Sequence, residues 1–197
     1  MSFIRFFLII LGCVTLRSFG FCQTPIELNN KALELSQLST DRNVIELAVA
    51  LLDSAIAIDS LYDVAYSNKI SILCRLGEKQ RAIKTLNSLL KIRPERSQLL
   101  VMKGNILEAM KDTEGAKKCY RRAMAKADSL VQQGKASHND LLDRAFLILL
   151  TVNKEAGIEE LDRLQKLYPN EPLFLEMMQT FREFDRKEHI SNICKSR

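Results

Sequence analysis

Apolar residues recur every three or four positions through most of the chain after residue 24, with polar residues between them. This spacing places the apolar side chains on one face of a helix. Few residues interrupt the pattern, because the chain holds only 7 glycines and 4 prolines. The pattern predicts helices over residues 25–39, 43–58, 63–76, 79–92, 96–110, 113–132, 138–151, 154–167 and 171–189.

Short motifs mark where these helices begin and end. Thr24–Glu27, TPIE, has the sequence of a capping box with proline at the first helical position. Ser137–Asp140, SHND, has the same form with aspartate in place of glutamate. Gly77 stands where a turn between helices is expected, and Pro94 and Pro169 cannot continue the helices that precede them.

The helical pattern repeats every 34 residues. In each copy a small residue is followed four positions later by a large one: Ala48 and Leu52, Ala82 and Leu86, Ala116 and Tyr120. A fourth copy follows the inserted segment Val131–Ser137, with Gly157 and Leu161 at the matching positions. Small side chains let a partner helix approach closely, and the large ones fill the gap between turns. The repeat therefore predicts stacked pairs of antiparallel helices.

This pattern resembles the tetratricopeptide repeat family over residues 29–169, in about four units. The second unit, Asp63–Arg96, matches best, at Tyr66, Leu73, Gly77, Ala82, Leu86, Leu90 and Pro94. Four positions depart from the family pattern: Lys69 and Lys103 replace leucine, Leu89 replaces a small residue, and Gly157 replaces alanine.

The resemblance implies an all-α fold, an α-solenoid of about four helix hairpins over residues 23–170. An apolar face over residues 171–189 is then expected to form a C-terminal capping helix, with a tail over 190–197. A docking surface for another protein is the alternative interpretation of that face.

The first 22 residues resemble a secretory signal peptide. Arg5 precedes an apolar run, Phe6–Leu16, and a short segment ending in Cys22 leads to a cleavage site before Gln23. The run is shorter than the ~20 residues that a membrane span needs. Two alternatives stay open: a lipoprotein anchored through Cys13, in the stretch ILGC, and an uncleaved anchor. We therefore expect an exported protein of the periplasm or cell envelope, at the membrane only if lipidated or signal-anchored.

Charge and residue chemistry exclude several classes of function. The net charge of +5 includes two arginines of residues 1–22, and the remaining +3 is too small to indicate nucleic-acid binding. His138 and His189 are the only histidines, and neither has ligands at the spacing of a metal site. Phosphate-binding loops and serine-nucleophile motifs are missing from the sequence. The sequence predicts no enzymatic activity, no cofactor and no metal site.

The cysteines and one basic run favour a structural interpretation over a functional one. Cys74, Cys119 and Cys194 remain after the expected cleavage, and this odd, widely spaced set does not form a disulfide framework. Cys74 and Cys119 are interpreted as small buried residues within helices. Lys117–Lys126 is interpreted as a solvated stripe rather than a patch for an acidic partner or lipid headgroups.

The family resemblance implies that the first helices of the units line a concave groove that binds peptides or protein segments. The expected groove residues are Ser67, Ser71, Cys74, Arg75, Gln98, Val101, Asn105, Glu108, Leu142 and Phe146, with Leu33, Gln37, Asn139 and Leu149 on the same surface. We therefore expect a non-catalytic protein–protein interaction module or scaffold of the cell envelope. The alternative is a lipoprotein that acts as an assembly factor for an envelope complex.

Overall fold

The computed structural model describes residues 23–194, so the expected leader, its lipidation site at Cys13 and its cleavage site lie outside the described residues. The helices are α2 Pro25–Leu38, α3 Arg42–Ile58, α4 Asp63–Arg75, α5 Lys79–Ile92, α6 Ser97–Ala109, α7 Thr113–Gln132, α8 His138–Thr151, α9 Lys154–Leu167, α10 Pro172–Glu183 and α11 Arg186–Asn192. Within residues 23–194, no helix combines the length and the apolar character that crossing a bilayer requires.

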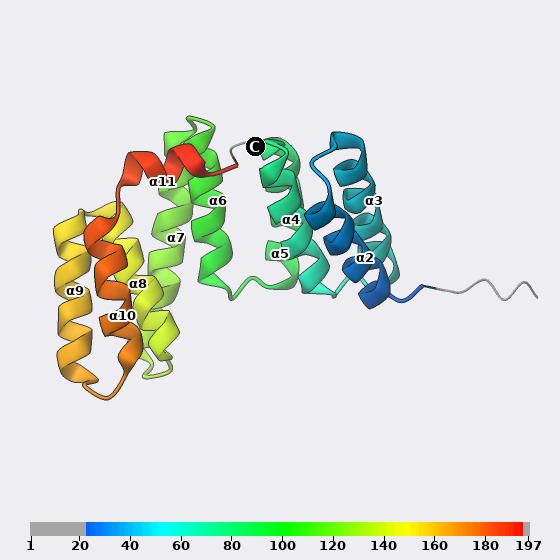
Figure 1. Ribbon diagram of the computed structural model, residues 1–197. Helices are drawn as coiled ribbons and strands as arrows, with labels where there is room; N and C mark the ends of the chain where they lie inside the picture. Colours follow the sequence, from blue (N-terminus) through cyan, green and yellow to red (C-terminus); the bar gives the residue numbers. More distant parts are fainter. Residues whose placement is uncertain (1–22, 195–197) are drawn as a thin grey trace, which may run out of the picture.

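Eight of these helices form four antiparallel pairs, α2/α3, α4/α5, α6/α7 and α8/α9, which stack side by side as a solenoid (Figure 1). The predicted all-α solenoid is confirmed. Both predicted capping boxes are present, with the Thr24 and Ser137 side chains accepting from the backbone of the third helical residue. Helix α10 packs on α9 and α8 at the C-terminal end of the stack.

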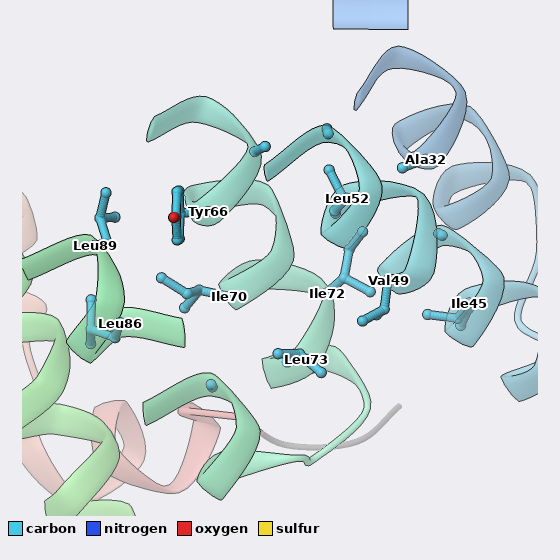
Figure 2. Packing of buried hydrophobic residues seen from close by; sticks show 14 of the residues in the cluster. Ala32, Ile45, Val49, Leu52, Tyr66, Ile70, Ile72, Leu73, Leu86 and Leu89 are labelled. Carbon is cyan, nitrogen blue, oxygen red and sulfur yellow. The ribbon is translucent and has the colours of Figure 1, made fainter. Parts of the chain in front are cut away.

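The small and large repeat residues form the core as the spacing predicts. Ala48 and Ala82 are fully buried, and Ala116 is 1% exposed. Figure 2 shows Leu52 and Leu86 within one continuous cluster of buried side chains. The contact at Gly157 explains why this unit lacks the usual alanine: an added Cβ there would lie 2.4 Å from the Cβ of Leu149.

Helix α6 divides the core into two clusters. Its Leu99 and Ile106 belong to the cluster built from α2 to α5, whereas its Leu100 belongs to the cluster built from α7 to α10. The boundary between the second and third units, where α5 meets α6, is more thinly packed than the other unit boundaries. Ile193 and Cys194 from the end of the described chain join the first cluster beside this boundary.

Polar pairs at equivalent repeat positions link successive units. In each, a basic residue of a first helix reaches the last turns of the preceding helix, 16 residues earlier: Lys69 and Asp53, Lys103 and Asn87, Arg144 and Asp128. These pairs explain why Lys69 and Lys103 depart from the family pattern. A lysine there places its charged end in a contact between units, which a leucine could not make.

The prediction of one helix over 171–189 was wrong. Helix α10 ends at Glu183, and the backbone of Phe184 (φ −59°, ψ 123°) leaves the helical conformation. Asp185 begins the separate helix α11 by accepting from the backbone N–H of Glu188 at 2.7 Å. An aspartate in this role favours a new helix start over continuation of the old one. Lys154 Nζ donates to the Arg182 carbonyl at 2.9 Å and so satisfies one of the free carbonyls at the end of α10.

The turns between α4 and α5 and between α6 and α7 have the same geometry with different residues. Gly77 has φ 73°, and Lys111, 34 residues later, has φ 67°. Each donates its N–H to the carbonyl three residues before it, and the next N–H reaches a residue five positions back. In both turns the residue that ends the helix has a left-handed backbone conformation. Glycine adopts this conformation without strain, whereas the Cβ of lysine lies close to backbone atoms.

The two turns predict opposite effects of exchanging their residues. We expect Gly77→Ala to lower the free energy of unfolding by about 1 kcal/mol, because alanine must adopt a left-handed conformation. Lys111→Gly should raise it by a comparable ~1 kcal/mol at the matching position. Urea denaturation of both variants checks this, and a stabilising Gly77→Ala or a destabilising Lys111→Gly would contradict it.

Candidate functional site

The inner faces of the first helices of three units line a hollow of about 440 Å³. Helices α4, α6 and α8 all contribute to its lining, which includes the apolar side chains of Ile70, Met102 and Ile106. Seven of the expected groove residues line it: Ser67, Ser71, Cys74, Gln98, Val101, Asn105 and Phe146. The remaining lining residues are Asp143 and the segment 192–194, none of which the sequence had placed in the groove.

The three remaining expected residues, Arg75, Glu108 and Leu142, make other contacts beside this hollow. Arg75 lines an adjacent hollow of about 690 Å³ and donates through Nη2 to the Ser36 carbonyl at 2.7 Å, which ties α4 to the end of α2. Glu108 binds side chains at the edge of the groove. Leu142 is partly buried against the second core cluster.

The structure also corrects one position of the wider surface that was predicted from the first helices. Gln37 lines the same 690 Å³ hollow as Arg75. Leu149 does not face the groove: it is 4% exposed and packs closely against Gly157 of α9. The side chain points to the second helix of its own unit because Gly157 leaves room for it there.

The groove contains the C-terminal segment of the chain itself. Helix α11 leaves the end of α10, turns back across α6 and brings the following residues beside α4 (Figure 1). Cys194 forms a disulfide with Cys74 across a sequence separation of 120 residues. The interpretation of Cys74 as a plain buried residue and the exclusion of a disulfide were wrong. Cys119 is buried, as expected, and has no disulfide partner within residues 23–194.

A hydrogen-bonded network holds α11 against α6. The Tyr120 hydroxyl lies 2.8 Å from Asn105 Oδ1 and 2.9 Å from Glu108 Oε2. Glu108 in turn accepts from two guanidinium nitrogens of Arg186, at 3.1 and 2.9 Å. Asn105 Nδ2 lies 3.1 Å from His189 Nε2. Burial raises the pKa of Tyr120, so the hydroxyl keeps the proton that it donates.

The imidazole of His189 is neutral in this network. Burial lowers its pKa and the nearby Arg186 lowers it further, whereas Glu108 acts in the opposite direction. In the contact with Asn105, the amide nitrogen Nδ2 donates to Nε2 of His189, which is the unprotonated nitrogen of the neutral ring. The ring packs edge-on to Phe146 with centroids 6.0 Å apart. The acidic residues Glu183, Asp185 and Glu188 line a hollow on its other side.

One carboxylate lies at the wall of the 440 Å³ hollow. Asp143 accepts a hydrogen bond from Gln98 of the neighbouring unit, and burial raises its pKa. The hydrogen bond between these two side chains links α6 to α8. It also places polar atoms at this end of the groove. Such a site, apolar at its centre with a few polar groups at its rim, suits the side chains of a bound segment.

Other reactive side chains have structural contacts away from the groove. His138 Nδ1 lies 2.5 Å from Glu171 Oε2, and its ring contacts Tyr168 and Phe174, which fastens α8 to the start of α10. Burial raises the pKa of the Cys119 thiol and disfavours the reactive thiolate. Within residues 23–194, no three histidine, cysteine or carboxylate side chains are grouped so that they could hold a metal ion.

Comparisons with known proteins agree with the repeat. The tetratricopeptide repeat family model matches residues 97–125, which cover α6 and part of α7. A tetratricopeptide repeat protein from Parabacteroides merdae superposes with a TM-score of 0.54 at 18% identity, over 80% of this chain and 57% of that one. This chain thus spans little more than half of that protein, and the likeness shows the fold.

Two further solved structures superpose less closely on this chain. YrrB, a TPR protein with an unusual peptide-binding site, has a TM-score of 0.42 at 19% identity, over 79% of this chain and 92% of that one. MamA from Desulfovibrio magneticus RS-1 has a TM-score of 0.44 at 20% identity, over 84% and 91%. No curated protein matches the chain.

The neutral state of His189 predicts that the contact of α11 with α6 weakens in acid. The folded pKa lies below the ordinary value of 6.5, so the free α11 binds more protons than the docked one as pH falls below 6.5. The docking of α11 on α6 is therefore most favourable above pH 6.5. Between 6.5 and the lower pKa of the docked state, the equilibrium constant for docking falls by up to about tenfold per pH unit.

Hydrogen exchange of α11 between pH 7.5 and 5.5, corrected for intrinsic rates, measures this effect. The variant His189→Gln keeps a neutral acceptor and should show no such pH dependence. Helix α9 is the internal control, and its protection should not change. Equal pH dependence in wild type and His189→Gln would show that another group is responsible.

Proposed function

We propose that this chain, a tetratricopeptide-repeat protein, is a non-catalytic interaction module that binds a segment of another protein in its concave groove. One observation carries the proposal: the groove already holds a peptide segment, the chain's own residues 186–194, through side chains of α4 and α6. A surface that holds one segment of polypeptide has the shape and the polar groups to hold another.

The groove is suited to binding because its walls are fixed before a partner arrives. The helices that line it are held by fully buried residues such as Leu73 and Ile106, and by the polar pairs between units. A preformed site loses little conformational entropy when it binds, so more of the contact energy appears as affinity.

The contacts of the C-terminal segment indicate the chemistry of the partner. Glu108 receives a basic side chain, Asn105 and Phe146 receive an aromatic ring with a hydrogen-bond acceptor, and the apolar space between α4 and α6 receives Ile193. The partner segment is accordingly a short helix or turn that presents a basic, an aromatic or imidazole, and an aliphatic side chain in this order.

The cell envelope is the proposed location. Residues 1–22 resemble a signal peptide, and disulfides persist mainly in oxidising compartments outside the cytosol. The Cys74–Cys194 pair is thus a second, independent feature that favours export. The lipoprotein alternative rests on the stretch around Cys13 and differs in how the chain is attached, not in how the groove binds.

Blocking the groove should abolish capture of the partner without unfolding the protein. Ser71 is exposed in the hollow, so Ser71→Arg places a bulky cation there without disturbing the core. Ser54→Arg adds the same side chain to the exposed face of α3 and is the matched control. We expect Ser71→Arg to reduce capture by about tenfold or more, the loss of a central contact, and Ser54→Arg to have no effect.

Cross-linking pull-downs from envelope fractions, made with dithiol present and quantified by mass spectrometry, measure the capture. Sequencing the cross-linked partner peptide checks the expected order of basic, aromatic and aliphatic side chains. If Ser71→Arg retains the proteins that wild type captures, the groove is not the binding surface.

The mass of the mature protein tests the proposed export. We expect a chain that begins at Gln23, because cleavage before this residue leaves the Thr24 capping box intact at the start of α2. Intact-mass spectrometry of protein from envelope fractions gives the answer. A diacylated chain beginning at Cys13 would replace this proposal with the lipoprotein alternative.

A further inference from the structure

We infer that the C-terminal segment 185–194 is a tethered occupant that closes the groove, and that the Cys74–Cys194 disulfide is a latch that a dithiol opens. The inference rests on the proposed function, since it concerns the regulation of the same groove. Four observations carry it: the course of the segment, the weakness of its own packing, the position of the disulfide and the access to it.

The segment lies where a partner would bind. Ser71, Cys74, Asn192 and Cys194 line both the 440 Å³ hollow and the 690 Å³ hollow. Residues 192–194 therefore separate two hollows of one groove, with the side chain of Ile193 packed against the first core cluster. A partner segment that runs along the inner helices must displace residues 192–194.

Apart from its two ends, the segment is weakly held. Helix α11 has 7 residues, none of them fully buried, and an isolated helix of this length is not stable in water. At its start, Arg186 contacts Glu108 and the Leu150 carbonyl, and at its end Cys194 is joined to Cys74. Between them, the polar contact of His189 with Asn105 holds the middle. Loss of the covalent end leaves contacts that a partner can replace.

The disulfide changes the competition between segment and partner. While it is closed, residues 192–194 cannot leave α4, whatever the concentration of the partner. Once it is open, the segment competes as a tethered ligand at an effective concentration in the millimolar range. A partner that makes the same contacts with additional surface can then exclude it.

The chemistry of opening is thiol–disulfide exchange. A thiolate of an external dithiol attacks one sulfur, forms a mixed disulfide and releases the other cysteine as a thiolate, which takes up a proton. The second thiol of the reductant then releases the remaining cysteine, so that two cysteine thiols and one oxidised dithiol result. Cys74 is only partly buried and borders both hollows, which gives the reductant a path of attack.

The test uses a fluorescent peptide with the chain's own C-terminal sequence, DRKEHISNI followed by serine in place of the cysteine. Its binding to the purified protein is measured by fluorescence anisotropy, and hydrogen exchange of α11 is followed in parallel. Peptide mapping without reductant first verifies the Cys74–Cys194 bond. The variants are Cys194→Ser, which removes the latch, and Cys119→Ser, which changes a free buried cysteine and serves as control.

We expect the oxidised protein to bind the peptide at least about tenfold more weakly than the dithiol-treated protein, because a closed latch excludes competition in trans. Cys194→Ser should bind as the treated protein does, with no further effect of dithiol, and Cys119→Ser should behave as wild type. Exchange of α11 should accelerate in each state that binds the peptide.

Distinct results separate this inference from the proposed function. Equal binding before and after reduction, or α11 still protected after it, would overturn the latch and leave the groove as a binding site. Failure of the peptide to bind any state, although exchange shows α11 released, would overturn both the occupant and the proposed partner chemistry. Absence of the Cys74–Cys194 bond in the mapping would overturn the latch directly.

Discussion

The close approach of helices at buried small residues is the constraint on which the rest of the structure depends. Ala48, Ala82 and Ala116 have almost no exposed surface, and each lies in the second helix of its pair. Because the residues recur every 34 positions, each pair stacks on the last in the same orientation and the first helices come to line one concave side. The groove is thus a consequence of this packing.

Where the stacking is thinner, the chain supplies other contacts. The boundary between α5 and α6 has less packing than the others, and α6 contributes Leu99 and Leu100 to different clusters. Ile193 and the Cys74–Cys194 disulfide lie beside this boundary, so the C-terminal segment covers apolar surface that the repeat leaves exposed. The thin packing between α5 and α6 therefore exposes apolar surface that either a partner or the C-terminal segment can cover.

The local features of this fold could be predicted from the sequence, and the features that join distant segments could not. Helix starts such as Thr24 and Ser137 depend on neighbouring residues, and their capping boxes formed as expected. The end of α10 was missed because the apolar periodicity continues through Phe184, whereas the helix start at Asp185 interrupts it. The partner of Cys74 was missed because the pairing depends on the path of the chain through α11 to Cys194, 120 residues later. Leu149 was misplaced because Gly157 offers it room that no pattern within α8 reveals.

Tyr120 shows how the repeat positions the candidate site. It is the large residue of the third unit, 2% exposed and packed so tightly on Gly104 that an added Cβ would lie 2.4 Å from its ring. That packing fixes the hydroxyl beneath Asn105 and Glu108, the two residues that hold α11. Leucine, which occupies this position in the first two units, would fill the same core but offer no hydroxyl. The third unit therefore differs from its neighbours at the residue that connects the core to the groove, and specificity for a bound segment can arise from one substitution within an otherwise structural repeat.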